Sequence, residues 1–594
     1  MQIVPVSGVL AGLLFVLAAT PTGAEQPTPK DNIIVTATRS PIPLSEAIVP
    51  VTVITRQDIE QSMASDLAEL LRFEAGLDIG RHGGPGQSTS MFLRGTESNH
   101  TLVLVDGVRI NPGTLGGAAI QNIAPEVIER VEIVKGARSA LFGTDAIGGV
   151  INIITRRSDR VFAEGGIGGG SFDTRSGFFA AGRRSEDADA GVALNWQDTD
   201  GFPASSASSI DRGFENLSAN IYAGKRVGSS YLSLRHWRAA GTAEYFDFFL
   251  APLDQDFTNE STAAELQTDF SDNVHSELVV SHIVDRIGQN QSDEFVESAR
   301  NALDWQLGLE RGNHRWTGGV YLVAENARSF AFGSGFDEDT TVKAIFLEDQ
   351  WTVERHGAFL AVRLTDHESF SNHTSWNAEY SFTLNERWTL NAGLGHAFRA
   401  PDATDRFGFG GNLSLGPETA DEAQLGLRFR PSARQAVELG YYHNDIEDLI
   451  EFDLASFELR NIAEGKIRGA ELSWEYEGNS YSLRTSLVKQ KANNGADGSR
   501  LFRRAEESMT VSLTKNFGAH RLGLSVLANG DRVDVGDAPL AGYLVADLSA
   551  QMALGDKWRV HARIENLLDT RYETAAGYRM QERSAFVDLR FDWR

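Results

Sequence analysis

The chain has 594 residues, and its 81 Asp and Glu against 55 Lys and Arg give a formal net charge of −26 at pH 7. Such an excess of negative charge disfavours nucleic acid as a partner. Beyond the N-terminal segment, no run approaches the roughly 18 consecutive apolar residues of a membrane-spanning helix, which excludes an α-helical membrane protein. The chain contains no cysteine, so disulfide frameworks and cysteine-ligated metal sites are also excluded.

The N-terminal residues 1–24 are expected to form a secretory signal peptide. An apolar run from Val9 to Ala19 precedes the small residues Thr22 and Ala24, which suit a cleavage point before Glu25. Met1 to Gly8 carries no Lys or Arg, which departs from the usual basic start and leaves the true start codon open. The apolar run is too short to span a membrane comfortably as an anchor.

Residues 25–156 form a first block with a net charge of −4, whereas the remainder of the chain carries −22. The segment from Asp58 to Arg72 predicts a short helix, with Ser65 or Asp66 as its N-cap. Turn signals such as Asp106-Gly107 separate short β runs. These runs are Met91–Leu93, Thr101–Val105, Val131–Val134 and Val150–Ile154. The pattern indicates a compact α+β domain.

Residues 157–594 alternate apolar and polar residues over most of their length. In the last segment Val587, Leu589, Phe591 and Trp593 alternate with charged residues. Repeated along the whole block, this alternation fits a transmembrane β-barrel whose outside faces lipid and whose inside is polar. The length suits about 22 antiparallel strands, although about 18 or 20 would also fit.

Polar, irregular stretches in this block predict long loops. They are Gly201–Phe214, Gly241–Glu260, Gln289–Arg300 and Asn326–Thr340. A soluble propeller is the alternative architecture, but no fixed-period motif of the kind that blades show is present.

Three groups of motifs resemble those of TonB-dependent outer-membrane receptors. The first resembles the TonB box, an extended segment that can add to a partner's sheet; it comprises Asp31, Asn32, Ile33, Ile34, Val35, Thr36 and Ala37. The second resembles the plug signatures in order and spacing, and comprises Phe92–Gly95, Val103–Val108, Ile128–Gly143 and Asp145–Thr155. The third matches the barrel pattern, and comprises Phe398–Pro401, Gly411–Glu418, Tyr441–Ile450, Asn461–Glu471 and Ile564–Asp569.

The resemblance implies an organisation and a mechanism. Residues 25–40 would be a periplasmic extension with the TonB box, 41–156 an α+β plug domain inside the lumen, and 157–594 the barrel in the bacterial outer membrane. Ligand would bind from outside, and TonB, with its inner-membrane energising complex, would pull on the plug. Such a receptor is a transporter rather than an enzyme.

Within the family the chain is most similar to the cobalamin receptors, because of its short barrel, its box and the run Arg81–Gln87. A ferric-siderophore receptor is the main alternative. The acidic stretch Gly241–Glu260 argues modestly against anionic catecholate chelates. Heme uptake is less well supported, since no His lies between Phe398 and Glu418.

The resemblance also implies site residues. Two plug loops, Gly83–Ser88 and Asn111–Ala118, would form the ligand-facing apex; the expected contacts are Gly84, Gly86, Gln87, Ser88, Pro112, Gly113, Thr114 and Leu115. Arg94 and Arg138 would fasten the plug to barrel glutamates. Glu471 matches one of these glutamates, and Gln424 stands where the other is expected.

Calcium is a further expectation, since Asp198, Asp200 and Asp211 lie in the loop region that holds this cation in cobalamin receptors. Carboxylate oxygens suit calcium, but solvated surface acids are the alternative interpretation. No other cofactor is expected.

Other function classes find less support. The sequence contains no G-x-S-x-G, H-E-x-x-H or P-loop motif that would indicate an enzyme. The plug signatures argue against a passive porin. A signalling receptor would need an additional domain before the box.

Overall fold

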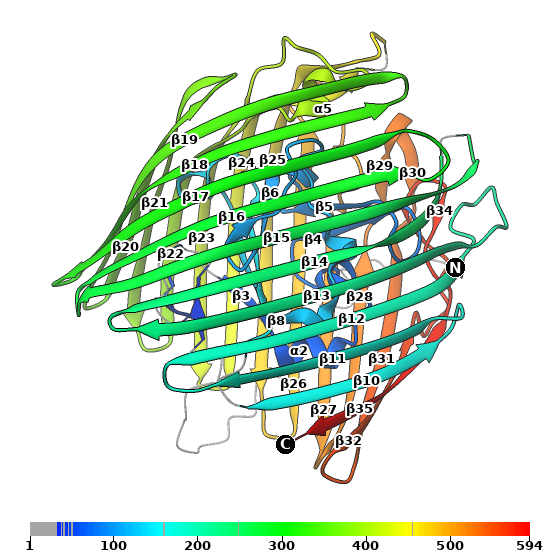
Figure 1. Cartoon of the computed structure of the whole chain (residues 1–594), viewed down its shortest axis with the longest axis horizontal. Coiled ribbons are helices and arrows are strands. Elements are labelled where there is room, and N and C mark those ends of the chain that lie inside the picture. Colours follow the sequence, from blue (N-terminus) through cyan, green and yellow to red (C-terminus); the bar gives the residue numbers. More distant parts are fainter. Residues whose placement is uncertain are drawn as a thin grey trace.

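The computed structural model describes residues 33–36, 39, 42–44, 47–48, 51–157, 161–247, 249–453 and 455–593. The predicted signal peptide and Asp31, Asn32 and Ala37 of the predicted box lie outside these residues. The largest element is a closed barrel of 22 antiparallel strands, which surrounds an N-terminal domain of strands and short helices (Figure 1). The predicted fold class is therefore confirmed.

The barrel strands follow one another in chain order, and the last pairs with the first. They are β10 (Phe162–Gly170), β11 (Arg175–Arg184), β12 (Ala188–Phe202), β13 (Arg212–Val227), β14 (Ser230–Phe246), β15 (Pro252–Ser271), β16 (Val274–Gln289), β17 (Phe295–Arg311), β18 (His314–Ala331), β19 (Ser334–Val353), β20 (His356–His367), β21 (Ser371–Asn385), β22 (Trp388–Arg399), β23 (Glu418–Ser432), β24 (Gln435–Asp453), β25 (Glu458–Glu477), β26 (Tyr481–Asn494), β27 (Glu507–Phe517), β28 (His520–Asn529), β31 (Tyr543–Leu554), β32 (Trp558–Glu565) and β35 (Ser584–Trp593). Because β10 pairs with β35, with Ala163 opposite Trp593, the sheet has no free edge.

Strand β20 shows why these sequences form a membrane barrel. Leu360, Val362 and Leu364 point outward and are about half exposed, at 55%, 41% and 50%. Arg363 and Thr365 alternate with them and are buried toward the lumen. An apolar outer face and a polar inner face are what a strand between lipid and an aqueous lumen requires. None of the helices in the described part of the chain is long and apolar enough to cross a membrane.

The end of the barrel that carries the C-terminus has short turns, and the opposite end carries the longer connections and helix α5 (Ala403–Phe407) (Figure 1). This second end is the extracellular one, since outer-membrane barrels place short turns in the periplasm. The prediction of long irregular loops is wrong for two stretches. Gly241–Glu260 is mostly β14 and β15, joined by 247–251, and Asn326–Thr340 is mostly β18 and β19, joined by 332–333. These strands continue beyond the lipid, where both faces meet water and the apolar alternation is lost.

The plug is built around a five-stranded sheet in the order β3-β8-β9-β6-β7. Its strands and the neighbouring hairpin are β3 (Val51–Thr55), β4 (Leu77–Arg81), β5 (Thr89–Leu93), β6 (Thr101–Val105), β7 (Val108–Arg109), β8 (Ile128–Lys135) and β9 (Gly149–Thr155). The predicted β runs correspond to β5, β6, β8 and β9. The sheet's apolar side chains, including Val103, Val131 and Ile151, are fully buried in the plug core.

The predicted helix between Asp58 and Arg72 is in fact two helices, α2 (Arg56–Ser62) and α3 (Leu67–Leu71). Met63 ends α2 in a left-handed conformation (φ +53°), which a continuous helix cannot contain. Asp66 caps α3 by accepting a hydrogen bond from the Glu69 backbone, as the sequence predicts.

The remaining short elements lie in the N-terminal segment, the plug loops and the extracellular connections. They are β1 (Ile34–Val35), β2 (Ile42–Pro43), η4 (Ser98–His100), η5 (Ile120–Asn122), η6 (Pro125–Val127), α4 (Ser139–Phe142), β29 (Arg532–Asp534), η7 (Val535–Asp537), β30 (Ala538–Leu540), β33 (Glu573–Ala575) and β34 (Tyr578–Arg579).

Candidate functional site

The described part of the predicted TonB box is folded against the plug. Strand β1 pairs antiparallel with β2, with Val35 opposite Ile42, and both side chains are buried in a small apolar cluster with Val134. The backbone N–H and the hydroxyl of Thr36 donate to the Glu132 carboxylate at 2.8 and 3.1 Å. The described part of the predicted box is thus already paired with β2 and hydrogen-bonded to the plug.

Arg39 ties the segment after the box to the barrel wall. Its guanidinium forms a two-pronged ion pair with Asp304 of β17, with both N···O distances at 3.0 Å. It also donates to the Leu141 carbonyl at 2.5 Å and lies over the Phe346 ring at 4.3 Å. Bidentate arginine–carboxylate pairs are directional and strong, so this contact fixes the position of the segment. The sequence gives no sign of this pair, because its members are 265 positions apart.

Apex loop 1, Gly83–Ser88, is largely covered by extracellular barrel segments. Gly86 has φ +73°, and a Cβ there would lie 2.0 Å from the Phe214 ring. Gln87 is buried and donates to the Glu244 carbonyl at 2.5 Å. Gly84 is buried too, whereas Ser88 is exposed. Of the four predicted ligand contacts in this loop, only Ser88 is exposed.

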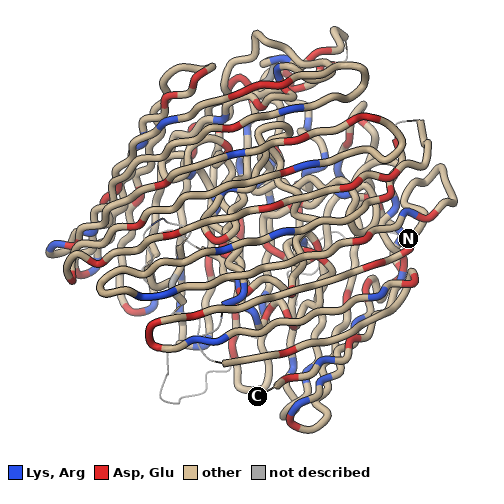
Figure 2. Tube along the Cα trace, in the orientation of Figure 1, with Lys and Arg blue, Asp and Glu red and all other residues tan. Residues whose placement is uncertain are grey.

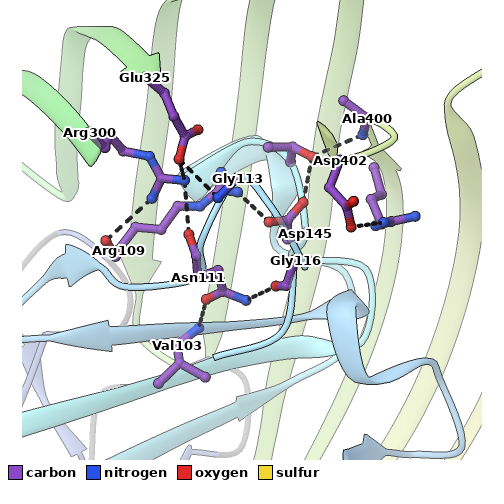
Figure 3. Close-up of polar contacts among 12 residues, drawn as sticks. Val103, Arg109, Asn111, Gly113, Gly116, Asp145, Arg300, Glu325, Ala400 and Asp402 are labelled. Atoms are coloured by element: carbon purple, nitrogen blue, oxygen red, sulfur yellow. Dashed lines mark hydrogen bonds and ion pairs between the residues drawn. The ribbon is translucent and has the colours of Figure 1, made fainter. Parts of the chain in front are cut away.

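Apex loop 2, Asn111–Ala118, is held from two sides (Figure 3). The Gly113 N–H donates to Glu325 of β18 at 2.9 Å, and Arg300 pairs with the same carboxylate at 2.8 Å. On the other side the backbones of Ala403 and Thr404 in α5 donate to the carbonyls of Gly113 and Thr114 at 2.9 and 3.1 Å.

These contacts bury most of apex loop 2. Pro112 and Thr114 are buried and Gly113 is half-buried, whereas Leu115 is 46% exposed. Of the eight predicted ligand contacts, Ser88 and Leu115 are therefore the exposed ones, and the other six are buried or half-buried.

Arg399, at the end of β22, organises the extracellular segment that contacts apex loop 2. It is fully buried and pairs with Glu418 at 2.8 Å, Asp402 at 3.0 Å and Asp405 at 2.5 Å. Glu418 also bonds to His100 of the plug at 3.0 Å. In the sequence, the Phe398–Pro401 motif indicated only the family. Asp402 and Asp405, three and six positions after Arg399, are the local feature from which this ion-pair cluster could have been predicted.

The predicted plug fastening is arranged around two arginines. Arg94 lies 3.4 Å from Glu471 and 3.4 Å from Glu422, and donates to Gln424 at 3.2 Å. Gln424 stands where the resemblance predicts a glutamate, yet Arg94 still has two acidic partners, Glu422 and Glu471. Arg138 is buried and pairs with Glu379 at 2.6 Å.

The three predicted calcium ligands do not form a cluster. Asp198 lies in β12 opposite Glu215, and Asp200 and Asp211 are exposed near the connection between β12 and β13. Within the described residues there is no group of three or more His, Cys, Asp or Glu that could hold a metal ion. Calcium binding stays a prediction to which this geometry adds no support.

Two polar cavities lie between the plug and the barrel wall. The lower cavity, of about 690 Å³, reaches the box segment and is lined by Thr36, Arg39 and Asp304. The upper cavity, of about 250 Å³, reaches α5. Arg109, Phe142 and Tyr321 line both cavities, so the two meet at these residues. Charged residues of both signs occur along the wall strands and at the hairpin ends (Figure 2).

The chain matches two family models over most of its length. The model described as TonB-dependent Receptor Plug Domain matches residues 43–150, and the model described as TonB dependent receptor-like, beta-barrel matches residues 150–567. Among curated proteins, the Vitamin B12 transporter BtuB of Vibrio vulnificus is 29% identical, covering 93% of each chain. BtuB of Vibrio cholerae is also 29% identical, covering 96% of this chain and 97% of its own.

Solved structures show the same fold at lower identity. A mutant of the ferric enterobactin receptor PfeA from Pseudomonas aeruginosa has a TM-score of 0.81 at 16% identity, covering 94% of this chain and 100% of that chain. The siderophore receptor PirA from Acinetobacter baumannii has a TM-score of 0.78 at 17% identity, covering 91% and 98%.

Proposed function

We propose, from the premise that this chain belongs to the TonB-dependent receptor family, that it transports a cobalamin-type corrinoid across the bacterial outer membrane. The family and fold imply an outer-membrane location, a TonB partner and a transported ligand. The observation that carries the corrinoid is similarity to vitamin B12 transporters that extends over nearly the whole of both chains.

Ligand arriving from outside meets the parts of the plug apex that the barrel leaves open. Ser88 and Leu115 are exposed there, and the backbone of apex loop 2 is hydrogen-bonded to α5. A ligand that contacts Leu115 and α5 together would favour one arrangement of loop and helix over another. Binding energy can shift a plug between two states only through such differential contacts.

TonB would act at the opposite end of the plug. The box leads into β3, which is an edge strand of the plug sheet and pairs only with β8. A pull from the periplasm would first separate the two-residue strands β1 and β2, then the Thr36–Glu132 and Arg39–Asp304 contacts, and then β3 from β8. Edge strands yield before central strands because they have one hydrogen-bonded neighbour instead of two.

Binding of cyanocobalamin to the purified protein, with and without calcium, tests the ligand. We expect saturable binding, and uptake by cells that stops when the proton gradient is collapsed. A Val35→Pro variant, which cannot extend a β-ladder at this position, should bind ligand normally but fail to transport it. Absence of cyanocobalamin binding together with gradient-dependent uptake of a ferric chelate would overturn the corrinoid proposal and favour a siderophore receptor.

A further inference from the structure

Arg363 is a buried cation for which the described structure offers no carboxylate partner. It lies on the lumen side of β20 and is 1% exposed. Its Nε donates to the Thr365 hydroxyl at 3.2 Å and its Nη1 to the Leu141 carbonyl at 3.4 Å. Among the described residues, no carboxylate lies within ion-pair distance of it and Nη2 has no hydrogen-bond acceptor. An uncompensated buried charge is costly, so its presence calls for an explanation.

Neighbouring arginines, in contrast to Arg363, each pair with a carboxylate. Arg109 pairs with Asp145, and Arg300 pairs with Glu325 at 2.8 Å. The carboxylate of Asp304 is taken up by Arg39. Among these described arginines, Arg363 is therefore the one without a carboxylate within ion-pair distance.

The surroundings of Arg363 keep its guanidinium in place without neutralising it. Its Cζ lies 5.2 Å from the centre of the Tyr321 ring and 5.9 Å from that of Phe346. A Cβ at Gly143, whose φ is +87°, would approach Nε and Nη2 to 3.3 Å. Aromatic faces attract a cation but supply no hydrogen-bond acceptor of carboxylate strength. The guanidinium is thus positioned and still has donor capacity to spare.

Arg363 lines the upper cavity close to the point where the two cavities meet. Tyr321, which faces its guanidinium, lines both cavities. Strands β17 and β18 also line both, so the cavities follow one side of the plug from α5 down to the box segment. Withdrawal of Thr36 and Arg39 with the box would remove part of the lower cavity's wall.

We propose that Arg363 is an oxyanion-binding subsite on a substrate route that runs between the plug and the wall strands β17 to β20. The route rests on the proposed transport function. The ligand chemistry is a phosphate or carboxylate oxygen, as carried by the phosphodiester of a nucleotide-bearing corrinoid or by an anionic metal chelate. Planar guanidinium groups with free N–H donors are well suited to such oxyanions.

Tungstate is a direct probe of the subsite, independent of which substrate is carried. Anomalous diffraction from wild-type crystals soaked in tungstate should show the ion within hydrogen-bond distance of Arg363, and crystals of Arg363→Met should lack it. Wild-type crystals without the ion at Arg363 would overturn the proposal. Because this readout needs no cyanocobalamin, it stays decisive if the corrinoid proposal fails.

Uptake distinguishes the sources of the oxyanion. Arg363→Met should lower uptake of a phosphodiester-bearing corrinoid about tenfold, the loss expected for one charge-assisted hydrogen bond, and leave uptake of a corrinoid without the phosphodiester unchanged. If an anionic ferric chelate is the substrate, its uptake should fall instead. Arg363→Lys should retain most of the activity. An equal loss for charged and uncharged forms would contradict the subsite.

Thermal stability is a second measurement, in which Arg363→Met should cause no loss although it lowers uptake. Arg363→Met removes an uncompensated buried charge and should leave the thermal unfolding midpoint unchanged or higher. The matched variant Arg300→Met leaves Glu325 buried without its cation and should lower the midpoint. A fall for Arg363→Met as large as that for Arg300→Met would assign Arg363 a structural role and refute the proposal.

Discussion

Loss of the Arg39–Asp304 ion pair should expose the box segment without any ligand or TonB. In an Asp304→Asn variant the carboxylate charge disappears while one hydrogen-bond acceptor remains. The side chain of Arg39 is 7% exposed and that of Asp304 is 25% exposed, so the pair is only partly screened by water. Hydrogen bonds to charged groups contribute about 1.5–3 kcal/mol. The lower end applies here because the asparagine keeps one acceptor, and about 1.5 kcal/mol corresponds to about a tenfold larger detached population.

The absence of native cysteine makes this population measurable by thiol labelling. Val35 is completely buried in the folded box segment, so a Val35→Cys side chain reacts only when that segment detaches. In the Asp304→Asn background its labelling rate should rise about tenfold, as long as detachment is fast compared with the chemical step.

The matched control is Asp189→Asn. Asp189 lines the same lower cavity and accepts a hydrogen bond from Tyr231, but it does not contact the box segment. Its substitution makes the same change in charge and should leave the labelling of Val35→Cys unchanged. An unchanged rate in Asp304→Asn, or an equal rise in both variants, would refute the idea that this ion pair holds the segment.

Three further predictions concern the plug. Gly86→Val should disorder apex loop 1, because its side chain would clash with Phe214 and valine is strained at φ +73°. Faster hydrogen exchange of that loop would detect this, and Phe214→Ala should restore protection only in part, since it removes the clash and leaves the backbone strain. Arg138→Met should destabilise the plug by about 3–5 kcal/mol, because it leaves Glu379 buried and unpaired. Chemical denaturation measures this loss, and an additional Glu379→Met change should recover most of it. Burial and the nearby Arg503 lower the pKa of His82 to about 4, so the docking of apex loop 1 should weaken as pH falls from 6.5 to about 4 and stay constant above 6.5. A spin label near the loop should show this change in the wild type and lose it in His82→Phe.

The sequence predicts the fold well where a helix or strand depends only on the pattern of its own neighbouring residues. Asp66 as an N-cap, the apolar run of β6 and the alternation at the end of β35 each depend on neighbouring residues only. The same reasoning fails where a strand leaves the lipid. In β14 and β15, backbone pairing continues from Gly241 opposite Phe257 to Phe246 opposite Pro252, although the side chains no longer alternate between apolar and polar.

Site residues were harder to predict because their roles arise from partners far along the chain. Gly84, Gly86 and Gln87 could be placed in an apex loop, but not the barrel side chains that cover them. Arg363 and Thr365 occupy alternating lumen positions of β20 that look equivalent in the sequence. Only the three-dimensional arrangement shows that Arg363 has no carboxylate within ion-pair distance among the residues that the structure describes.

The box segment is held by fewer contacts than the plug apex, and we expect this difference to set the order in which they separate. The extracellular end is held by apex loops packed against barrel side chains, by backbone hydrogen bonds to α5 and by the Arg300–Glu325 pair. The box segment depends on two-residue strands, the Thr36–Glu132 contact and the Arg39–Asp304 pair. The body of the plug has separate ion pairs to the barrel, such as Lys135–Glu471 and Arg484–Glu74. We therefore expect a periplasmic pull on the box segment to open the lower cavity while the apex remains docked. Substrate would then leave the upper cavity past Arg363 only after the box has been withdrawn. The periplasmic end of the route would stay closed until TonB pulls on the box.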